Sequence, residues 1–285
     1  MCSAKMCPIT NERILLATDG SEYSQGAIRE AIGFAKICSS KLYAMSVIEV
    51  VTDYEAFSPQ KVEEAMEAGV KKHLETIKAQ ALKEGVECEA FISYGDPHQN
   101  IVDEAARRRI DLIFIGRRGT AGLKKLLMGE TAAKVIGHAD CKVIVVPRAA
   151  AIGPKNILIA TDGSGHSLAA VEEGLNIAKR CGSSVIALSS ARNNDELGAA
   201  QANVEKVIEM AKKEDIPVEG ITPVGRSYNL IVETAGGRGV DLIVMGIPVK
   251  TAFKKIFTGS ATEQVIGHAG CAVLIVKGGE SPATV

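Results

Sequence analysis

The chain has 285 residues, a length that allows two domains of ordinary size, each with its own core. With 46% hydrophobic residues, 24% charged residues and a net charge of −1, it has the composition of a soluble globular protein without a strongly basic nucleic-acid surface. No run approaches the roughly 20 apolar residues of a membrane span, and residues 1–13 lack the apolar core of a signal peptide. We therefore expect a cytoplasmic protein that binds neither nucleic acid nor membrane.

Apolar spacing predicts an alternation of strands and helices through the first half of the chain. The expected strands occupy 13–18, 41–50, 87–95, 111–116 and 142–147. The expected helices occupy about 27–35, 59–84, 97–109 and 131–138. Strands that alternate with helices imply right-handed crossovers and a parallel sheet covered on both faces.

The two halves of the chain repeat one another. The sequence ATDGS stands at Ala17–Ser21 and again at Ala160–Ser164, an offset of 143 residues (160 − 17). Near the end of each half, VIGHADCKVIVV at 135–146 matches VIGHAGCAVLIV at 265–276 with an offset of 130. The first half is therefore thirteen residues longer (143 − 130), and the excess lies within Val50–Cys88. Such a segment could form a lid over a ligand or simply lengthen the loop and helix.

The joint between the repeats falls in the small-residue stretch Arg148–Asn156, where Gly153 and Pro154 indicate a linker. The sequence thus predicts one domain over 1–149 and a second over 155–285. We predict an α/β fold of two tandem doubly wound domains, each with a five-stranded parallel sheet and helices on both faces.

Candidate ligand-binding residues lie where the strands end, because open parallel sheets bind ligands beyond their carboxyl ends, where the strand order reverses. Asp19 and Asp162 follow the first strand of each half, although Asp-Gly-Ser is also ordinary turn chemistry. A loop with Gly116, Gly119 and Gly129 follows the fourth strand and leads directly into a helix. Glycine allows backbone N–H groups to approach a phosphate, and a helix N-terminus adds partial positive charge.

Two common nucleotide-binding motifs are absent from the sequence. There is no G-x-G-x-x-G after the first strand and no G-x-x-x-x-G-K-[ST] anywhere. Their absence argues against a dinucleotide-dependent dehydrogenase and against a P-loop NTPase.

The ATDGS turn, the G-x2-G-x9-G loop and the closing VIGHADCKVIVV segment together resemble the universal stress protein family, and the resemblance covers nearly all of both halves. It implies an α/β fold in which ATP-binding members use a G-x2-G-x9-G-[ST] loop for ribose and phosphates. By this resemblance Asp19 would face the ribose, Val47 would contact adenine through its backbone, and Gly116 would lie under the ribose. Gly119, Gly129 and the first turn of the last helix would hold the phosphates.

The resemblance implies ATP, with or without Mg²⁺, as the cofactor. The implied binding residues in domain 1 are Ala17, Thr18, Asp19, Val47, Gly116, Arg117, Gly119, Gly129, Glu130 and Thr131. The implied binding residues in domain 2 are Ala160, Thr161, Asp162, Gly246, Gly259 and Ser260. The two domains would pair through their last strands as an internal pseudo-dimer, and two chains could associate further into a homodimer.

Both loops depart from the family pattern. In domain 1, Glu130 occupies the small hydroxyl position, with Thr131 one place later. A carboxylate about 4 Å from a phosphate costs on the order of 4 kcal/mol at an effective dielectric of 20. Glu130 is therefore compatible with a nucleotide only if its side chain turns away or Mg²⁺ intervenes; alternatively, its carboxylate itself occupies the anion position. In domain 2, Val249 replaces the middle glycine, and a β-branched side chain blocks close backbone approach.

Three functions are compatible with these residues. The leading interpretation is a nucleotide-responsive stress protein that acts as a binding module. The second is an interaction scaffold that has lost nucleotide binding, which the defects in both loops favour. The third is a slow ATP hydrolase, ranked last because no histidine, cysteine or carboxylate pair converges on the loop as a base or nucleophile.

The histidines and cysteines that repeat between the halves are expected to be structural. His138 and His268 lie late on a helix, where a cation suits the helix dipole. The seven cysteines are expected to be reduced thiols, packed as small apolar side chains where they recur. Cys2 and Cys7 do not recur, and no neighbouring residue would activate them.

Overall fold

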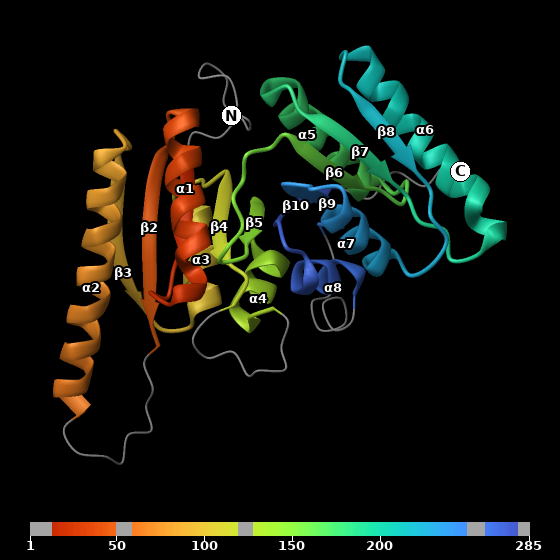
Figure 1. Ribbon diagram of the computed structural model, residues 1–285. Coiled ribbons are helices and arrows are strands. Elements are labelled where there is room, and N and C mark those ends of the chain that lie inside the picture. The colour runs from red at the N-terminus through yellow and green to blue at the C-terminus, as the bar shows by residue number, and fades with distance from the viewer. Residues whose placement is uncertain (1–12, 50–58, 119–127, 250–259, 279–285) are drawn as a thin grey trace.

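The computed structural model of the chain describes residues 13–49, 59–118, 128–249 and 260–278 (Figure 1). The first half contains β1 (Arg13–Ala17), α1 (Gln25–Cys38), β2 (Lys41–Ile48), α2 (Pro59–Lys83), β3 (Cys88–Tyr94), α3 (Pro97–Arg107), β4 (Leu112–Gly116), α4 (Glu130–His138) and β5 (Lys142–Val146). The second half contains β6 (Asn156–Ala160), α5 (Gly165–Cys181), β7 (Ser184–Leu188), α6 (Leu197–Lys213), β8 (Val218–Ile221), α7 (Ser227–Gly237), β9 (Leu242–Pro248), α8 (Ala261–His268) and β10 (Ala272–Gly278). The alternation predicted from apolar spacing is confirmed in both halves.

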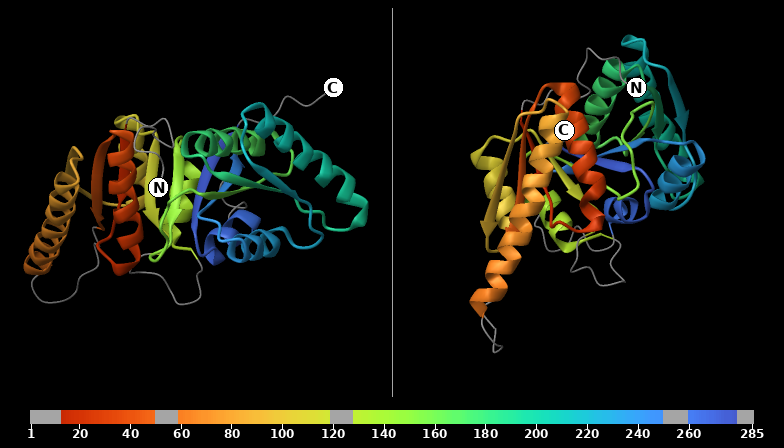
Figure 2. Two further views of the ribbon diagram at one scale, coloured as in Figure 1. Left: turned by 45° about the horizontal axis from the view of Figure 1, so that its top comes forward. Right: turned by 60° about the vertical axis from the view of Figure 1, so that its left-hand side comes forward.

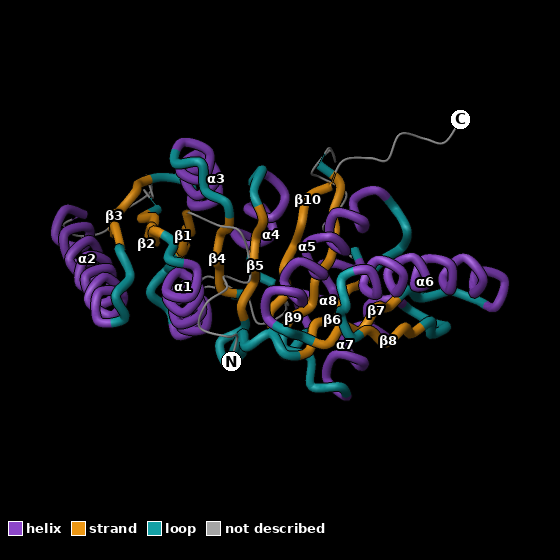
Figure 3. The backbone as a smooth tube through the Cα atoms, turned by 90° about the horizontal axis from the view of Figure 1, so that it is seen from above, coloured by secondary structure: helices purple, strands orange, loops and turns teal. Residues whose placement is uncertain are grey.

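The ten strands form one continuous sheet in the order β3-β2-β1-β4-β5-β10-β9-β6-β7-β8 (Figure 3). Within each half the strands run parallel, and β5 pairs with β10 in the antiparallel direction, with Val145 opposite Val273. The predicted fold class and the predicted pairing of the last strands are both confirmed. The first strand of each half lies between the second and the fourth, so the strand order reverses beside β1 and beside β6.

Apolar residues on both faces of the sheet build two separate cores. In β1, Ile14 and Leu16 pack against α1 and α2, whereas Leu15 and Ala17 face the side covered by α3 and α4. The same alternation continues through the second half, where α5 and α6 share the first core and α7 and α8 share the second. A strand buried on both faces must be apolar throughout, which explains the continuous hydrophobic runs of the sequence.

The repeats differ in the helix that follows their second strand. Helix α2 has 25 residues and α6 has 17, so the longer helix accounts for eight of the thirteen extra residues of the first half. Helices α2 and α6 lie at opposite ends of the molecule (Figure 2). The alternative of a lid concerns residues 50–58, which lie outside the described part of the chain.

Each domain contributes one basic side chain that donates a hydrogen bond to a carbonyl at the end of a helix in the other domain. Arg117, after β4, donates from Nη1 to the backbone oxygen of Ala269 at the end of α8 (2.8 Å). Lys277 in β10 donates from Nζ to the backbone oxygen of Gly137 in the last turn of α4 (2.9 Å). Burial lowers the pKa of both side chains, and the charge of Arg118 lowers the pKa of Arg117 further. Each cation therefore lies at the negative end of a helix dipole, and together they fix the domains across the β5–β10 pair.

The cysteines divide into two groups. Cys88, Cys141, Cys181 and Cys271 are free, and burial raises the pKa of Cys141 to about 12 and that of Cys271 to about 11. Burial also raises the pKa of Cys88 to about 11, so the thiols of Cys88, Cys141 and Cys271 are protonated at neutral pH, as a packing role requires. Cys38 is disulfide-bonded, so the expectation of a reduced thiol is wrong at this position.

Candidate functional site

The predicted binding residues of domain 1 lie where the carboxyl ends of β1 and β4 stand side by side. Ala17, the last residue of β1, pairs with Ile115, so Thr18 and Gly116 lie next to each other at the rim of the sheet. The end of β2 joins this rim because the Ser46 hydroxyl donates to the Thr18 backbone oxygen (2.7 Å). These three strand ends place Ala17, Thr18, Asp19, Val47 and Gly116 at one edge of the sheet.

The ATDGS turn in domain 1 is held by its own side chains. The Thr18 hydroxyl accepts from the Gly20 N–H (3.2 Å), and Asp19 Oδ1 accepts from the Ser21 N–H (3.0 Å). Gly20 has φ of +75°, a conformation that glycine adopts without strain. Asp19 therefore stabilises the turn, as an Asp-Gly-Ser sequence commonly does. It is also exposed at the edge of the sheet, where a ligand could reach it.

His73 on α2 is a residue of this site that the sequence did not reveal. Its Nε2 lies 3.3 Å from the Thr18 hydroxyl oxygen, and its ring covers Gly20. Burial lowers the pKa of His73, and the negative charge of Asp19 opposes this shift. His73 reaches the turn because α2 folds back over it, and this contact lies beside the first strand and not at the glycine-rich loop. The repeat gives one indication of this contact. Asn203, which corresponds to His73 at an offset of 130, covers Gly163 in domain 2.

Gly116 and Gly246 are required by internal packing. A Cβ at Gly116 would lie 3.0 Å from the backbone oxygen of Tyr23, and one at Gly246 would lie 2.1 Å from that of His166. In each domain the strand end therefore passes directly beneath the start of the first helix. This contact explains the repeated glycine whether or not a ribose lies above it.

The glycine-rich loop of domain 1 is closed at its base and ends in an uncapped helix. The Gly129 N–H donates to the Arg117 backbone oxygen (2.8 Å), so the backbone of Arg117 shapes the loop while its side chain bonds Ala269. Gly129 is the N-cap of α4 and has no side chain to bond the free N–H groups of the first turn. Thr131 lies half-buried in this turn, and Gly119 lies outside the described residues.

Glu130 does not occupy the anion position at this helix end. Its side chain is 74% exposed and pairs with Lys134 one turn along α4, with Oε1 2.7 Å from Nζ. The pair lies on the outer side of the helix. Of the alternatives that the sequence left open, the structure shows the one in which the carboxylate turns away.

In domain 2 the corresponding helix end is already satisfied. The Ser260 hydroxyl accepts from the Glu263 N–H (3.1 Å), as in the S-x-x-E capping box. Val249 is exposed after β9, and Gly259 lies outside the described residues. The first turn of α8 therefore has fewer free N–H groups than that of α4.

The turn of domain 2 is built in the same way as that of domain 1. Thr161 lies 3.0 Å from the Ser167 hydroxyl, and Asp162 Oδ1 accepts from the Ser164 N–H (3.0 Å) and from its hydroxyl. Partial burial opposes ionisation of Asp162, but the hydrogen bonds from Ser164 outweigh it, so the pKa of this carboxyl is lowered. The Nε2 atom of His166 lies 3.9 Å from Asp162 Oδ2. Ala160 and Gly246 thus frame a rim like that of domain 1, with Asp162 held in its turn as Asp19 is.

The two repeated histidines each lie against a backbone carbonyl of their own helix. His138 Nδ1 lies 2.8 Å from the Lys134 backbone oxygen, and His268 Nδ1 lies 2.8 Å from that of Gln264. Within the described part of the chain, no cluster of histidine, cysteine and carboxylate side chains could hold a metal ion. No helix among the described residues is long and apolar enough to cross a membrane.

Comparisons with known proteins agree with this architecture. The model of the universal stress protein family matches residues 10–147 and again 153–277. A universal stress protein of Methanocaldococcus jannaschii is 33% identical over 145 residues, which are 48% of this chain and 82% of that protein. One from Synechocystis is 31% identical over 148 residues, which are 47% of this chain and 96% of that protein.

A solved structure matches both halves together. The crystal structure of a universal stress protein from Archaeoglobus fulgidus has a TM-score of 0.81 and 21% identity, and covers 97% of this chain and 99% of its own. At that identity the match shows the fold. Since the family model matches both halves, the chain belongs to the universal stress protein family, with two such domains in tandem.

Proposed function

We propose that this protein is a nucleotide-binding stress protein that binds ATP in domain 1 and not in domain 2. The observation that carries this proposal is the difference between the two helix ends. Gly129 leaves the N-terminus of α4 without a side-chain cap, whereas Ser260 caps α8. An uncapped helix N-terminus after a glycine-rich loop favours a phosphate group.

The remaining contacts of domain 1 are compatible with this ligand. Asp19 is exposed beside the strand ends, where a ribose hydroxyl could bond its carboxylate. The Glu130 carboxylate, paired with Lys134, lies away from the position a phosphate would take. Mg²⁺ would reach the site with the nucleotide, because the described residues offer no metal site of their own.

Domain 2 is better suited to a supporting role. Its helix cap leaves fewer N–H groups free for a phosphate. Its last strand instead completes the sheet of domain 1 through the β5–β10 pair. In this proposal the chain works in the cytoplasm as an internal pseudo-dimer with one nucleotide site. Sedimentation of the full chain tests whether two chains associate into a homodimer.

The proposal is tested by calorimetric titration of the full chain with Mg-ATP, comparing Asp19→Ala with Asp162→Ala. The two residues are matched, since each carboxylate accepts one turn N–H at 3.0 Å. We expect the Asp19 variant to lose at least tenfold in affinity and the Asp162 variant to bind like the wild type. Absence of binding by the wild type at millimolar Mg-ATP would favour the scaffold function. Turnover of ATP abolished by Asp19→Ala would favour the hydrolase.

A further inference from the structure

His73 joins helix α2 to the turn that carries Asp19. Its Nε2 atom lies 3.3 Å from the Thr18 hydroxyl oxygen, and its ring lies over Gly20, where an added Cβ would be 3.6 Å from the ring atom Cδ2. Thr18 and Gly20 are the neighbours of Asp19 in the chain. The histidine therefore contacts the turn on both sides of the carboxylate.

The hydrogen bonds of Thr18 determine which form of His73 makes this contact. The Thr18 hydroxyl donates to the Ser24 hydroxyl (2.9 Å), and the Ser24 hydroxyl donates to the Ser21 backbone oxygen (2.8 Å). Because the hydrogen of Thr18 is used in this way, its oxygen accepts from His73, and Nε2 carries a hydrogen. In the neutral ring Nδ1 is then the basic nitrogen, which takes up a proton in acid.

The charge of the His73 ring depends on burial and on Asp19. Partial burial lowers the pKa of His73, and the negative charge of Asp19 opposes this shift. Within the described part of the chain, Asp19 is the charged group that acts on the ring from the elements packed against α2. The charged side chains of α1, β2 and β3 pair elsewhere, Arg29 with Glu30, Lys36 with Glu84, and Lys41 with Glu89.

Helix α2 itself adds no charge on the face of His73. The residues one turn away on either side, which share that face, are Gly69, Val70, Thr76 and Ile77. Protonation of His73 would therefore place a positive charge whose nearest ionic partner is Asp19.

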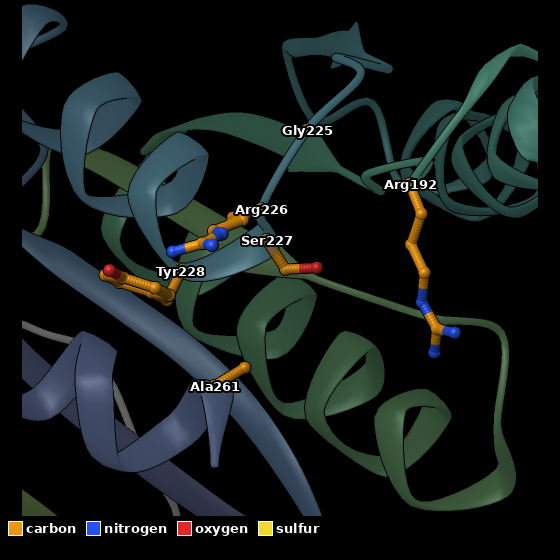
Figure 4. A pocket seen from close by; sticks show the side chains of 6 residues that line it. All are labelled: Arg192, Gly225, Arg226, Ser227, Tyr228 and Ala261. Carbon is orange, nitrogen blue, oxygen red and sulfur yellow. The ribbon is translucent and has the colours of Figure 1, made fainter. Parts of the chain in front are cut away.

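Domain 2 has a different residue at this position. Asn203 covers Gly163, and its amide, which does not titrate, donates to the Ser189 hydroxyl (3.4 Å). Helix α6 also contributes none of the described lining of the pocket at this edge of domain 2 (Figure 4), which consists of Arg192, Gly225, Arg226, Ser227, Tyr228 and Ala261. A titratable side chain against the turn is therefore a feature of domain 1.

We propose that His73 is a positioning residue for nucleotide binding in domain 1, and that its protonation weakens the binding of ATP. The inference rests on the proposed function, in which a ribose hydroxyl donates to the Asp19 carboxylate. The neutral ring holds the turn through Thr18 and leaves this carboxylate to the ribose. A proton on Nδ1 makes the ring a cation that attracts the same carboxylate. Proton and nucleotide thus compete for Asp19, and each weakens the binding of the other.

The direction of the pH dependence follows from this competition. Nucleotide binding to the protonated form releases a proton, so the affinity for Mg-ATP rises with pH. It levels off above pH 6.5, because the pKa of the folded chain lies below that ordinary value and the ring is neutral there. One charge interaction at a solvated site changes affinity by about fivefold.

The test is calorimetric titration of the full chain with Mg-ATP at about pH 5.5 and about pH 7.5, on either side of the ordinary histidine pKa. His73→Gln offers Thr18 an N–H donor that does not titrate, so it should bind like the wild type at the higher pH. Between the two pH values the wild type should lose about fivefold more affinity than His73→Gln. The titration of ATP itself is common to both proteins and cancels in this comparison.

Two further variants complete the comparison. His73→Phe keeps a ring over Gly20 but cannot donate to Thr18, so it should bind several-fold more weakly than His73→Gln at both pH values. His166→Gln is the matched control, because His166 lies beside Asp162 in domain 2. It should keep the pH profile of the wild type.

The ring protons of His73 give a test that needs no variant. Their chemical shifts, followed against pH with and without Mg-ATP, should show that the pKa falls when the nucleotide binds. An unchanged or raised pKa would overturn the inference, as would equal pH profiles for the wild type and His73→Gln. In either case ATP still binds and the proposed function stands. Absence of binding by the wild type at every pH would overturn both.

Discussion

The Ser260 hydroxyl accepts a hydrogen bond from the Glu263 N–H at 3.1 Å, and so caps in domain 2 the helix end that Gly129 leaves open in domain 1. The two domains share one fold but differ in whether a side chain caps the N-terminus of the last helix. A capped helix end gains stability, whereas an open one keeps N–H groups for a ligand.

The cap itself predicts a pair of stability effects. Ser260→Ala should lower the free energy of unfolding by about 1 kcal/mol, because the Glu263 N–H loses its partner. Gly129→Ser should raise it by a few tenths of a kcal/mol, since the backbone there (φ −67°, ψ 144°) suits a serine N-cap. Urea denaturation measures both. The Gly129→Ser variant should also bind Mg-ATP several-fold more weakly, and unchanged affinity would show that this helix end does not contact phosphate.

Removal of the acidic side chain at the same helix end should strengthen nucleotide binding. Glu130→Ser restores the small hydroxyl and removes a negative charge, which in water is worth about 1 kcal/mol at 4 Å from a phosphate charge, or roughly fivefold in affinity. Because Glu130 is exposed, the gain should shrink at high salt. Titration with Mg-ATP at two salt concentrations checks this, with Glu263→Ser in domain 2 as the control. A weaker Glu130→Ser complex would show that the carboxylate assists binding.

His73 should make stability depend on pH. Since its pKa in the folded chain lies below the ordinary value of 6.5, the unfolded chain takes up the proton more readily. The contribution of neutral His73 to the free energy of unfolding is therefore complete above pH 6.5. It is lost as the pH falls from 6.5 through the lower pKa of the folded chain. The chemical shift of its ring protons should report that lower pKa, and His73→Asn, which copies Asn203, should flatten the pH dependence. A pKa at or above 6.5 would contradict the burial argument.

The two cations between the domains should contribute more than surface ion pairs. Arg117→Met and Lys277→Met each remove a charged hydrogen bond to a helix-end carbonyl, at 2.8 and 2.9 Å. We expect each to cost about 1.5–3 kcal/mol of unfolding free energy. Arg238→Met, which breaks an exposed ion pair within domain 2, should cost about 0–1 kcal/mol. Equal effects for all three variants would show that the cross-domain bonds carry no special weight.

Much of the fold could be predicted because the two repeats of the chain can be aligned with each other. The offsets of 143 and 130 residues align strands that then prove equivalent, and the apolar runs mark strands buried on both faces. The pairing of the last strands followed from family resemblance, and the structure shows it directly.

The remaining features of the sites depend on residues that differ between the repeats. His73 reaches the turn only because α2 folds over it, and its counterpart Asn203 has another chemistry. Likewise, the outward turn of Glu130 depends on Lys134, a partner that the loop pattern does not include. Repeated residues indicated the shared fold, whereas the divergent ones carry the differences in function that we propose.

The most direct measurement is the number of ATP molecules bound per chain. Freshly purified protein would be saturated with Mg-ATP, separated from free ligand and denatured, and the released nucleotide quantified by chromatography and mass spectrometry. We predict one ATP per chain, lost in Asp19→Ala and retained in Asp162→Ala. Two per chain would show that the Ser260 cap does not close domain 2, and none would show that neither domain binds ATP.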